Sequence, residues 1–486
     1  MLLGLDLGTS SVKALLMEEN GEAVGEGSAP YEVLAPRPGW AESSPGEWWD
    51  AVMQATGTAV GGRGAGVTAL GLSGQMHGVV LADGGGSPLR PAILWADARS
   101  GAELAAYRGL DEDLRRRLAN PPAVGMAGPS LLWLRDNEPE AYAAARWALQ
   151  PKDWLRMRLT GEVAAEPSDA SATLLYDLPA DDWSYEVVDH LGLRAGLLAP
   201  LISSADVAGK LTAEAAEELG LPQGLPVAAG AADTAASMLG VGLSRTGPAQ
   251  LTIGTGGQIV TPRESPEVDP HFRTHLYRGA LPGLWYSMAA IQNAGLALEW
   301  VRKILGVSWS EVYDEAFAVP PGSGGLTFLP YLSGERTPRF DPGARGAWTG
   351  LGLDHTRGHL LRAALEGVAF ALREGLEALE DLGGAGVELR LAGGGASGAG
   401  GGAEDPWRQL LADVLGRPLW LLPEEVSAVA SARGAALLAG LASGVYSSAE
   451  DTLSLTPEPQ SKVQPGDADY EAAYERYKDL YPKLYG

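Results

Sequence analysis

The chain has no cysteine among its 486 residues, and this absence excludes a disulfide framework and any thiol chemistry. Basic residues are also few: 36 lysines and arginines stand against 61 aspartates and glutamates, for a formal net charge of −25. This balance argues against nucleic acid or an anionic membrane surface as a partner, because both are negatively charged. An anionic nucleotide remains compatible, since a divalent cation and local N–H donors set the field at its site.

Long apolar runs are missing as well. No stretch approaches the length of a membrane-spanning helix, and the first residues run into Asp6 without the basic region of a signal peptide. We therefore expect a cytoplasmic protein. Its 45% hydrophobic and 20% charged residues are ordinary for a globular chain. The length predicts two domains and leaves room for a third.

Two glycine-hinged segments, half a chain apart, carry the strongest signal in the sequence. The first spans residues 2–15 and turns at Gly8-Thr9-Ser10, and the second spans residues 250–260 and turns at Gly254-Thr255-Gly256. Each predicts an apolar strand, a tight turn and a returning strand. Because the pattern restarts, we infer a duplication with a boundary near residue 245, giving domains 1–245 and 246–486.

The two turns are suited to binding phosphate. Glycine permits backbone angles at which several N–H groups converge, and threonine and serine hydroxyls add further donors. Two such turns facing each other could hold the phosphates of one nucleotide from both sides. The residues predicted to bind these phosphates are Gly8, Thr9, Ser10, Lys13, Gly254, Thr255 and Gly256.

Two aspartates lie where predicted strands end. Asp6 enters the first turn and is the candidate magnesium ligand, because Mg²⁺ favours a carboxylate together with waters and substrate phosphates. An aspartate that bonds only to its own turn is the alternative. Asp233 follows the apolar strand Leu225–Ala229 and precedes a helix, so it is either a helix N-cap or a base that accepts the proton of a substrate hydroxyl.

A third cluster follows the predicted strand Val67–Ser73. Gln75, Met76 and His77 gather an amide, an apolar side chain and an imidazole that could bond sugar hydroxyls and cover a ring or chain edge. A histidine with a purely structural role is the alternative. Trp95 and Asp97 could complete the same pocket, although Asp97 and Arg99 could equally form a plain ion pair.

The segment Gly393–Gly398 matches the dinucleotide pattern G-x-G-x-x-G and follows a predicted strand. A nicotinamide-dependent oxidoreductase is therefore an alternative. The next helix, however, begins near Pro406, too far beyond Gly398 for its N-terminus to meet a pyrophosphate. We interpret the cluster instead as a platform for a purine or ribose.

Seven segments, in chain order, are highly specific in combination: Asp6–Ser10, Gly74–Gly78, Ile93–Arg99, Pro151–Asp153, Gly230–Asp233, Phe328–Pro338 and Gly393–Ala396. Together they make nearly the whole chain similar to the FGGY family of carbohydrate kinases. The resemblance implies an α/β, two-lobed actin-like ATPase (ribonuclease H-like) fold, with duplicated domains and a central interdomain cleft that holds ATP and Mg²⁺. Within the family, Gln75-Met76-His77-Gly78 indicates D-xylulose, because glycerol-using members carry an Arg-Glu pair there.

The resemblance also implies roles for single residues. Asp233 would be the catalytic base, Asp6 would serve catalysis through magnesium, and the sugar would contact Met76 and His77. The remaining candidates for the sugar are Gln75, Trp95, Asp97 and Thr234, and those for the nucleoside are Gly394, Gly395, Ala396 and Ser397.

The chain departs from the family pattern at four places: Thr234, where relatives usually carry asparagine, Gly257, Ser130, and the glycine-rich stretch 397–404. None removes a catalytic group, but the first leaves the sugar preference open.

The implied activity is direct in-line transfer of a phosphoryl group from ATP to D-xylulose. Ribulose, gluconate or glycerol as the acceptor is the near alternative, and a filament-forming or chaperone-like ATPase of the same fold is a remoter one. The implied partners are the sugar and ATP, with neither nucleic acid nor membrane, and a homodimer is left open.

Overall fold

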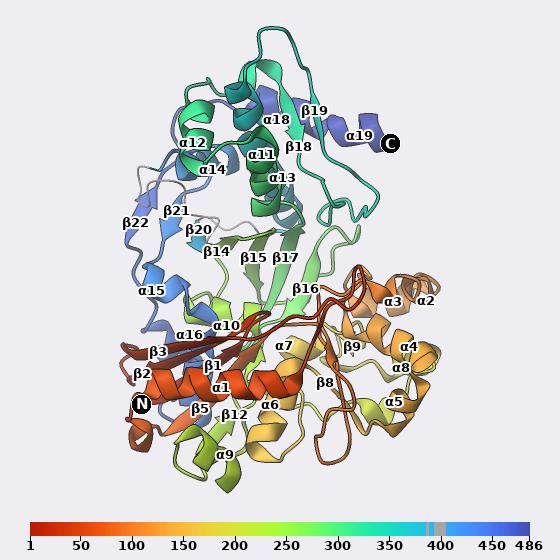
Figure 1. Ribbon diagram of the computed structural model, residues 1–486, viewed down its shortest axis with the longest axis vertical. Helices are drawn as coiled ribbons and strands as arrows, with labels where there is room; N and C mark the ends of the chain where they lie inside the picture. Colours follow the sequence, from red (N-terminus) through yellow and green to blue (C-terminus); the bar gives the residue numbers. More distant parts are fainter. Residues whose placement is uncertain (385–387, 393–404) are drawn as a thin grey trace.

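The computed structural model describes residues 1–384, 388–392 and 405–486. Two lobes, each built on a mixed sheet, lie one above the other in Figure 1, with the N-terminal sheet drawn in red to yellow-green below the C-terminal one. Helices pack against both sheets. The predicted two-lobed α/β fold is confirmed.

The N-terminal sheet has the strand order β11-β12-β5-β1-β2-β3, with β13 added beside the end of β5. β1 runs antiparallel to β2 and parallel to β5, so the first predicted hairpin supplies the middle of the sheet. The strands are β1 (Leu2–Leu7), β2 (Ser11–Met17), β3 (Ala23–Pro30), β5 (Ala69–Gly74), β11 (Val207–Lys210), β12 (Pro226–Ala228) and β13 (Ala231–Ala232).

The C-terminal sheet repeats this topology. Its order is β16-β17-β15-β14-β20-β21-β22, and β14 is antiparallel to β15 and parallel to β20. The run β17-β15-β14-β20-β21-β22 therefore matches β3-β2-β1-β5-β12-β11 strand for strand. The strands are β14 (Ala249–Ile253), β15 (Gly257–Arg263), β16 (His275–Arg278), β17 (Trp285–Ile291), β20 (Leu389–Ala392), β21 (Leu419–Leu421) and β22 (Ser461–Val463).

Four short strand pairs lie outside these sheets in the described part of the chain. They are β4 (Glu42–Ser43) with β7 (Ala92–Ile93), β6 (Val80–Ala82) with β8 (Trp147–Leu149), β9 (Tyr176–Asp177) with β10 (Asp182–Trp183), and β18 (Thr327–Leu329) with β19 (Ala347–Thr349).

Helices from both halves of the chain cover the N-terminal sheet. α1 packs on β2 and β3, whereas α16 packs on β1 and β5 although it comes from the C-terminal part of the sequence (Figure 1). The close approach of α16 requires glycine: a Cβ on Gly4 would lie 1.9 Å from the carbonyl oxygen of Ala432, and one on Gly71 would lie 1.9 Å from that of Ala435. The chain thus passes the predicted boundary near residue 245 between α10 and β14 and later returns to the first sheet.

The helices of the first half are α1 (Pro45–Val60), α2 (Leu104–Arg108), α3 (Glu112–Leu118), α4 (Ala127–Asn137), α5 (Pro139–Ala144), α6 (Pro151–Thr160), α7 (Pro167–Ala170), α8 (Tyr185–His190), α9 (Ala213–Leu219) and α10 (Asp233–Gly240). Those of the second half are α11 (Gly295–Leu305), α12 (Trp309–Phe317), α13 (Arg357–Glu380), α14 (Pro406–Leu415), α15 (Glu424–Ser427), α16 (Ala430–Ala442), α17 (Ala449–Leu453), α18 (Glu471–Lys478) and α19 (Leu480–Tyr485). Among the described residues, no helix combines the length and the apolar character that crossing a membrane would need.

Candidate active site

Three parallel strands, β1, β5 and β13, end at the same edge of the N-terminal sheet. Asp6 on β1 lies opposite Ser73 on β5, and Ser73 lies opposite Ala231 on β13, two residues before Asp233. Ser73 Oγ donates a hydrogen bond of 2.7 Å to Asp6 Oδ1. The fold therefore brings the two predicted catalytic carboxylates, Asp6 and Asp233, to one place, where each is only partly covered.

Burial raises the pKa values of both carboxylates. Burial raises the pKa of Asp233 to about 7, and the neighbouring charge of Asp6 adds to the rise. Burial also raises the pKa of Asp6, against the opposing effects of the Ser73 hydrogen bond and the Lys13 charge. A carboxyl group with a pKa near 7 can accept a proton at neutral pH, and a cation bound at this edge would favour the ionised form of both groups.

Asp233 does not cap its helix. It is the first residue of α10, the N-cap position belongs to Ala232, and Oδ1 of Asp233 accepts a 2.6 Å hydrogen bond from the N–H of the next residue, Thr234. The Thr234 hydroxyl also points to Asp233 Oδ1, at 3.2 Å. The side chain of Thr234 thus contacts the proposed base itself, and its contact with a sugar stays a prediction.

The first glycine turn presents free donors next to Asp6. Gly8 N–H donates to Ser11 O at 3.1 Å and closes the turn. The N–H groups of Thr9 and Ser10 donate to no backbone acceptor in the part of the chain that the structure describes. Trp95 Nε1 donates to Thr9 Oγ1 at 2.8 Å, and the Trp95 ring remains 38% exposed. These free N–H groups suit a phosphate oxygen.

The second turn also presents free N–H groups but is one residue shorter, since Ile253 pairs with Gly257 whereas Leu7 pairs with Val12. Gly254 N–H donates to Gly256 O at 2.8 Å, and within the described ranges the N–H groups of Thr255 and Gly256 have no backbone partner. Gln250 on β14 donates through Nε2 to Ser237 Oγ on α10, at 3.4 Å. Since α10 begins at Asp233, this contact ties the strand that enters the second turn to the helix that carries the proposed base.

Lys13, a predicted phosphate-binding residue, contacts a distant part of the chain. Lys13 Nζ donates to Ala428 O at 2.7 Å, so the structure ties Lys13 to the residue that follows α15. The predicted nucleoside-binding residues Gly394, Gly395, Ala396 and Ser397 lie outside the described residues.

His77 is a neutral imidazole that the structure holds by one ring nitrogen. Burial is the main cause that lowers the pKa of His77 to about 4, so the ring is uncharged at pH 7. Its Nδ1 lies 2.7 Å from Ala172 O, and because a carbonyl oxygen only accepts, we assign the proton to Nδ1. The other ring nitrogen, Nε2, is then an acceptor for a hydroxyl donor.

Gln75 and Met76 lie beside the first turn. Gln75 is fully buried, and its Nε2 lies 3.4 Å from Gly8 O and 3.3 Å from the hydroxyl of Tyr31. Tyr286 Oη, from the other lobe, donates to Met76 Sδ at 3.7 Å. The sugar-pocket candidates of the N-terminal lobe therefore touch a strand of the C-terminal lobe.

Asp97 is held by structural contacts. Its carboxylate accepts hydrogen bonds from Ala41 N–H at 2.6 Å and from Arg99 Nη2 at 2.7 Å, and only 1% of Asp97 is exposed. The Asp97–Arg99 pair that the sequence offered as an alternative is present, and both oxygens of Asp97 are engaged.

Sequence reasoning missed the aromatic residues that the second lobe contributes. Tyr277 lies 6.0 Å from the His77 ring and 5.5 Å from the Tyr286 ring, and it stacks on His275. Arg336, within a segment quoted for the family resemblance, lowers the pKa values of both histidines through its charge. The alternating aromatic pattern of β16 was the available signal, but nothing local placed it against residue 77.

The residues present suit a divalent cation and a nucleotide. Ser73 occupies Oδ1 of Asp6, whereas Oδ2 accepts no hydrogen bond among the described residues. No group of three or more histidine, aspartate or glutamate side chains in the described ranges could hold a metal ion. A single carboxylate beside a phosphate site matches the habit of Mg²⁺, which keeps several waters and binds substrate phosphates.

Comparisons with known proteins agree with this arrangement. The family model of the N-terminal domain of the FGGY carbohydrate kinases matches residues 1–240, and that of the C-terminal domain matches residues 249–443. The xylulose kinase of Escherichia coli (strain K12) is 36% identical over 488 residues, which cover 100% of this chain and 98% of that protein.

Two solved structures share the fold over their whole length. The xylulose kinase from Rhodospirillum rubrum is 33% identical, with a TM-score of 0.90 and coverage of 99% of this chain and 98% of that one. The gluconate kinase from Lactobacillus acidophilus is 26% identical, with a TM-score of 0.92 and coverage of 99% and 97%. Matched by the models of both domains and by relatives along its full length, the chain belongs to the FGGY family of carbohydrate kinases.

Proposed function

We propose that this kinase transfers the γ-phosphoryl group of ATP to the terminal O5 hydroxyl of D-xylulose. The observation that carries the proposal is the pair Asp6 and Asp233 at one sheet edge, beside a turn of free N–H groups. The identity to xylulose kinases and the Gln75-Met76-His77-Gly78 segment support D-xylulose as the acceptor.

The two glycine turns would hold the phosphates. The donors would be the free N–H groups of Thr9 and Ser10 in one lobe and of Thr255 and Gly256 in the other, which the turns hold in place before an anion binds. Preorganised donors of this kind contribute more than donors in water, because no solvent has to reorient as charge develops.

The sugar would lie against Met76 and His77. His77 Nε2, left as an acceptor, would take a hydrogen bond from a sugar hydroxyl, and Met76 would cover an apolar edge. Tyr286 holds Met76 from the opposite lobe, so binding of the sugar would depend on both lobes.

In the chemical step Asp233 accepts the proton of the sugar hydroxyl. The hydroxyl oxygen forms a bond to the γ-phosphorus as the bond between that phosphorus and its bridging oxygen breaks, and ADP leaves. No phosphoenzyme is formed. When bound through Asp6, Mg²⁺ supplies positive charge to the phosphates. Positioning carries most of the catalysis, because the transition state of phosphoryl transfer is loose.

The proposal includes three further predictions from the sequence: domains of 1–245 and 246–486, a nucleoside platform at residues 394–397, and a cytoplasmic location. It leaves open whether the protein is a homodimer. Relatives usually carry asparagine where this chain has Thr234, whose hydroxyl points to Asp233. Acceptors related to D-xylulose should therefore be tested as well.

A coupled assay of ADP release tests the proposal. Purified protein is given ATP, Mg²⁺ and, one at a time, D-xylulose, D-ribulose, gluconate and glycerol, with a sugar-free control. We expect the highest kcat/KM with D-xylulose. A higher value with another acceptor would reassign the substrate, and ATP turnover that no sugar accelerates would favour an ATPase switch.

A further inference from the structure

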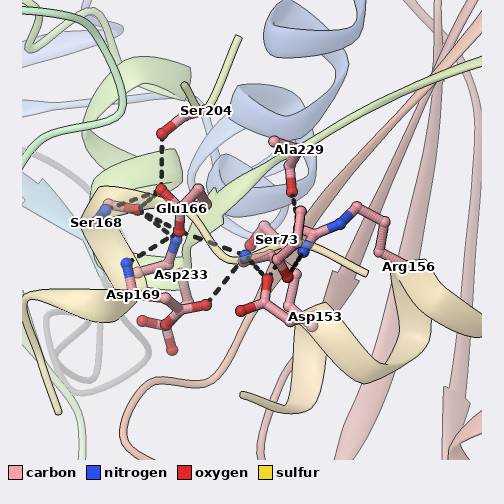
Figure 2. Close-up of polar contacts among 12 residues, drawn as sticks. Ser73, Asp153, Arg156, Glu166, Ser168, Asp169, Ser204, Ala229 and Asp233 are labelled. Atoms are coloured by element: carbon pink, nitrogen blue, oxygen red, sulfur yellow. Dashed lines mark hydrogen bonds and ion pairs between the residues drawn. The ribbon is translucent and has the colours of Figure 1, made fainter. Parts of the chain in front are cut away.

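Five charged side chains are buried together behind the proposed base (Figure 2). Lys152, Asp153 and Arg156 come from α6, and Glu166 and Asp169 from the N-terminal end of α7. Each is at most 1% exposed. Lys152 Nζ lies 2.6 Å from Asp153 Oδ1, 3.3 Å from Glu166 Oε1 and 3.2 Å from Asp169 Oδ2.

Such a cluster is a poor device for stability alone. Removing several charges from water costs more free energy than their mutual attraction usually returns, and apolar side chains of similar size often stabilise a fold better. The cluster nevertheless keeps its central cation: burial opposes it, but Asp153, Glu166 and Asp169 together raise the pKa of Lys152. The role of the cluster is therefore to be found in the groups that it holds in position.

The cluster holds the Glu166 side chain in place, and Glu166 orients the Ser168 hydroxyl. The Glu166 carboxylate accepts hydrogen bonds from Ser168 N–H at 2.8 Å, from Asp169 N–H at 2.9 Å and from Ser204 Oγ at 2.7 Å. It also accepts the Ser168 hydroxyl at 2.8 Å. Because the only proton of that hydroxyl is used in this way, Ser168 Oγ can act toward other groups only as an acceptor.

Ser168 in turn holds the strand that carries the proposed base. Ala232 N–H donates to Ser168 Oγ at 2.9 Å, and Ala232 directly precedes Asp233. The two-residue strand β13 is paired with β5 on one side, so Ser168 takes the place of a neighbouring strand on the other. Figure 2 shows the route from the charged cluster through Glu166 and Ser168 toward Asp233.

The same short segment contacts two other parts of the site. Ala172 O holds the His77 ring, and Ser171 Oγ accepts a 3.0 Å hydrogen bond from Arg278 N–H, on β16 of the second lobe. Residues 166–172 thus join the base, the sugar-facing imidazole and the opposite lobe, and the buried charges anchor that segment to α6.

We propose that Ser168 is a positioning residue for Asp233: oriented by Glu166, it holds the backbone at Ala232 so that the carboxylate meets the sugar hydroxyl in line with the phosphoryl group. The inference rests on the proposed function, in which Asp233 is the base. Small displacements of a reacting group are costly in phosphoryl transfer, where a shift of about 1 Å can reduce the rate about a hundredfold.

A double-mutant cycle tests this inference. Ser168→Ala removes the acceptor of Ala232 N–H with little change in volume, and we expect kcat to fall about 10- to 100-fold while the KM for ATP stays within about twofold. In the Asp233→Asn background the same change should cost less than about twofold, because a displaced base can no longer matter. Single-turnover transfer of labelled phosphate makes the weak activities measurable.

The chain offers a matched control in the other lobe. Ser323 is fully buried and donates to the buried Glu366 at 2.7 Å, so Ser323→Ala removes the same kind of hydrogen bond away from Asp233 and should leave kcat within about twofold. If Ser168→Ala does not fold, Ser204→Ala removes a single donor to Glu166, and we expect a loss of about two- to fivefold in the same cycle.

Two different failures are distinguishable. An unchanged kcat in Ser168→Ala, or an equal loss in both backgrounds, overturns the positioning role and leaves the proposed base intact. An Asp233→Asn variant that keeps more than about a tenth of the wild-type kcat overturns the proposed base, and the positioning role with it.

Discussion

The two central hairpins occupy equivalent places in their sheets and differ at the entrance to the turn. β1 and β14 each lie between an antiparallel and a parallel strand of their own sheet. The segment Leu5-Asp6-Leu7-Gly8-Thr9 therefore corresponds to Leu251-Thr252-Ile253-Gly254-Thr255. Opposite Asp6 stands Ser73, whereas opposite Thr252 stands Ala392. Both hairpins keep a Gly-Thr pair at the turn, although the first turn is one residue longer, and the carboxylate stands in only one.

This difference separates two tasks that one duplicated unit can perform. A turn of free N–H groups binds an anion whatever the strand before it carries. A carboxylate at its entrance adds a place for a cation, and its charge adds to the rise that burial causes in the pKa of Asp233. The acidic edge would serve chemistry and the neutral edge would serve binding of the nucleotide.

The largest expected effect comes from removing the base on the acidic edge. Asp233→Ala should lower kcat by about two to four orders of magnitude, because the sugar hydroxyl loses its proton acceptor. Nucleotide affinity, measured by titration calorimetry, should change by less than about twofold. Near-normal kinase rates in this variant would contradict the role of Asp233.

The sharpest test of the comparison substitutes the equivalent positions of the two hairpins, one in each variant. Asp6→Asn should lower kcat about a hundredfold and shift the Mg²⁺ dependence to higher concentration, because a carboxylate ligand is lost. Thr252→Val, the matched change on the neutral edge, should cost less than about threefold. Equal losses in steady-state rates measured across a Mg²⁺ titration would show that the two edges do not divide the work.

A third test breaks the turn that we assign to the nucleotide. A Cβ on Gly256 would lie 2.7 Å from Ile291 O, so Gly256→Ala must displace the backbone that carries the free N–H groups. We expect the KM for ATP to rise about tenfold, with the KM for D-xylulose within about twofold. Gly57→Ala on α1, where a Cβ meets nothing within 4 Å, is the control, and a rise in the sugar KM alone would refute the assignment.

The smallest effect concerns stability. Because the pKa of Asp233 is raised to about 7 from its ordinary 3.8, the folded state binds more protons than the unfolded state between these values, and stability falls as pH rises toward 7. Asp233→Asn removes this penalty, which is at most about 4 kcal/mol. In metal-free buffer its Tm should exceed that of the wild type by several degrees at pH 8 and match it near pH 4.

The control for this measurement is Asp50→Asn, which removes an exposed carboxylate on α1 and should leave the difference near zero at both pH values. A Tm gain that is the same at pH 4 and pH 8 would mean that a cause other than ionisation stabilises the Asp233→Asn variant.

Local patterns were enough for the parts of the site that lie on single hairpins or strand ends. The glycine turns, Asp6 and Asp233 could be located because short apolar runs and the turn residues that follow them mark the ends of buried strands. The apolar pattern of residues 356–379 likewise predicts a long helix, because it repeats over many turns, and the structure has α13 at Arg357–Glu380.

Contacts between distant segments could not be predicted. Met76 meets Tyr286, 210 residues away, and Lys13 meets Ala428; no local pattern encodes either partner. Asp97 is an example of a local prediction that distant packing overrules: it was a candidate for the sugar pocket, but its carboxylate forms a buried ion pair with Arg99. The sequence showed Lys152 only within the segment Pro151–Asp153. Folding brings the carboxylates of Glu166 and Asp169 to it, and no local pattern indicates them.

The packing of α16 on β1 has a consequence for how the protein is made. Gly4 leaves the ribosome well before the helix that covers it, because Ala432 on α16 lies 428 residues further along the chain. At about 5–20 residues per second, the nascent sheet waits roughly 20–90 seconds for that cover. During synthesis the first lobe therefore stays incomplete, with one face of its central strands uncovered, until α16 has been made.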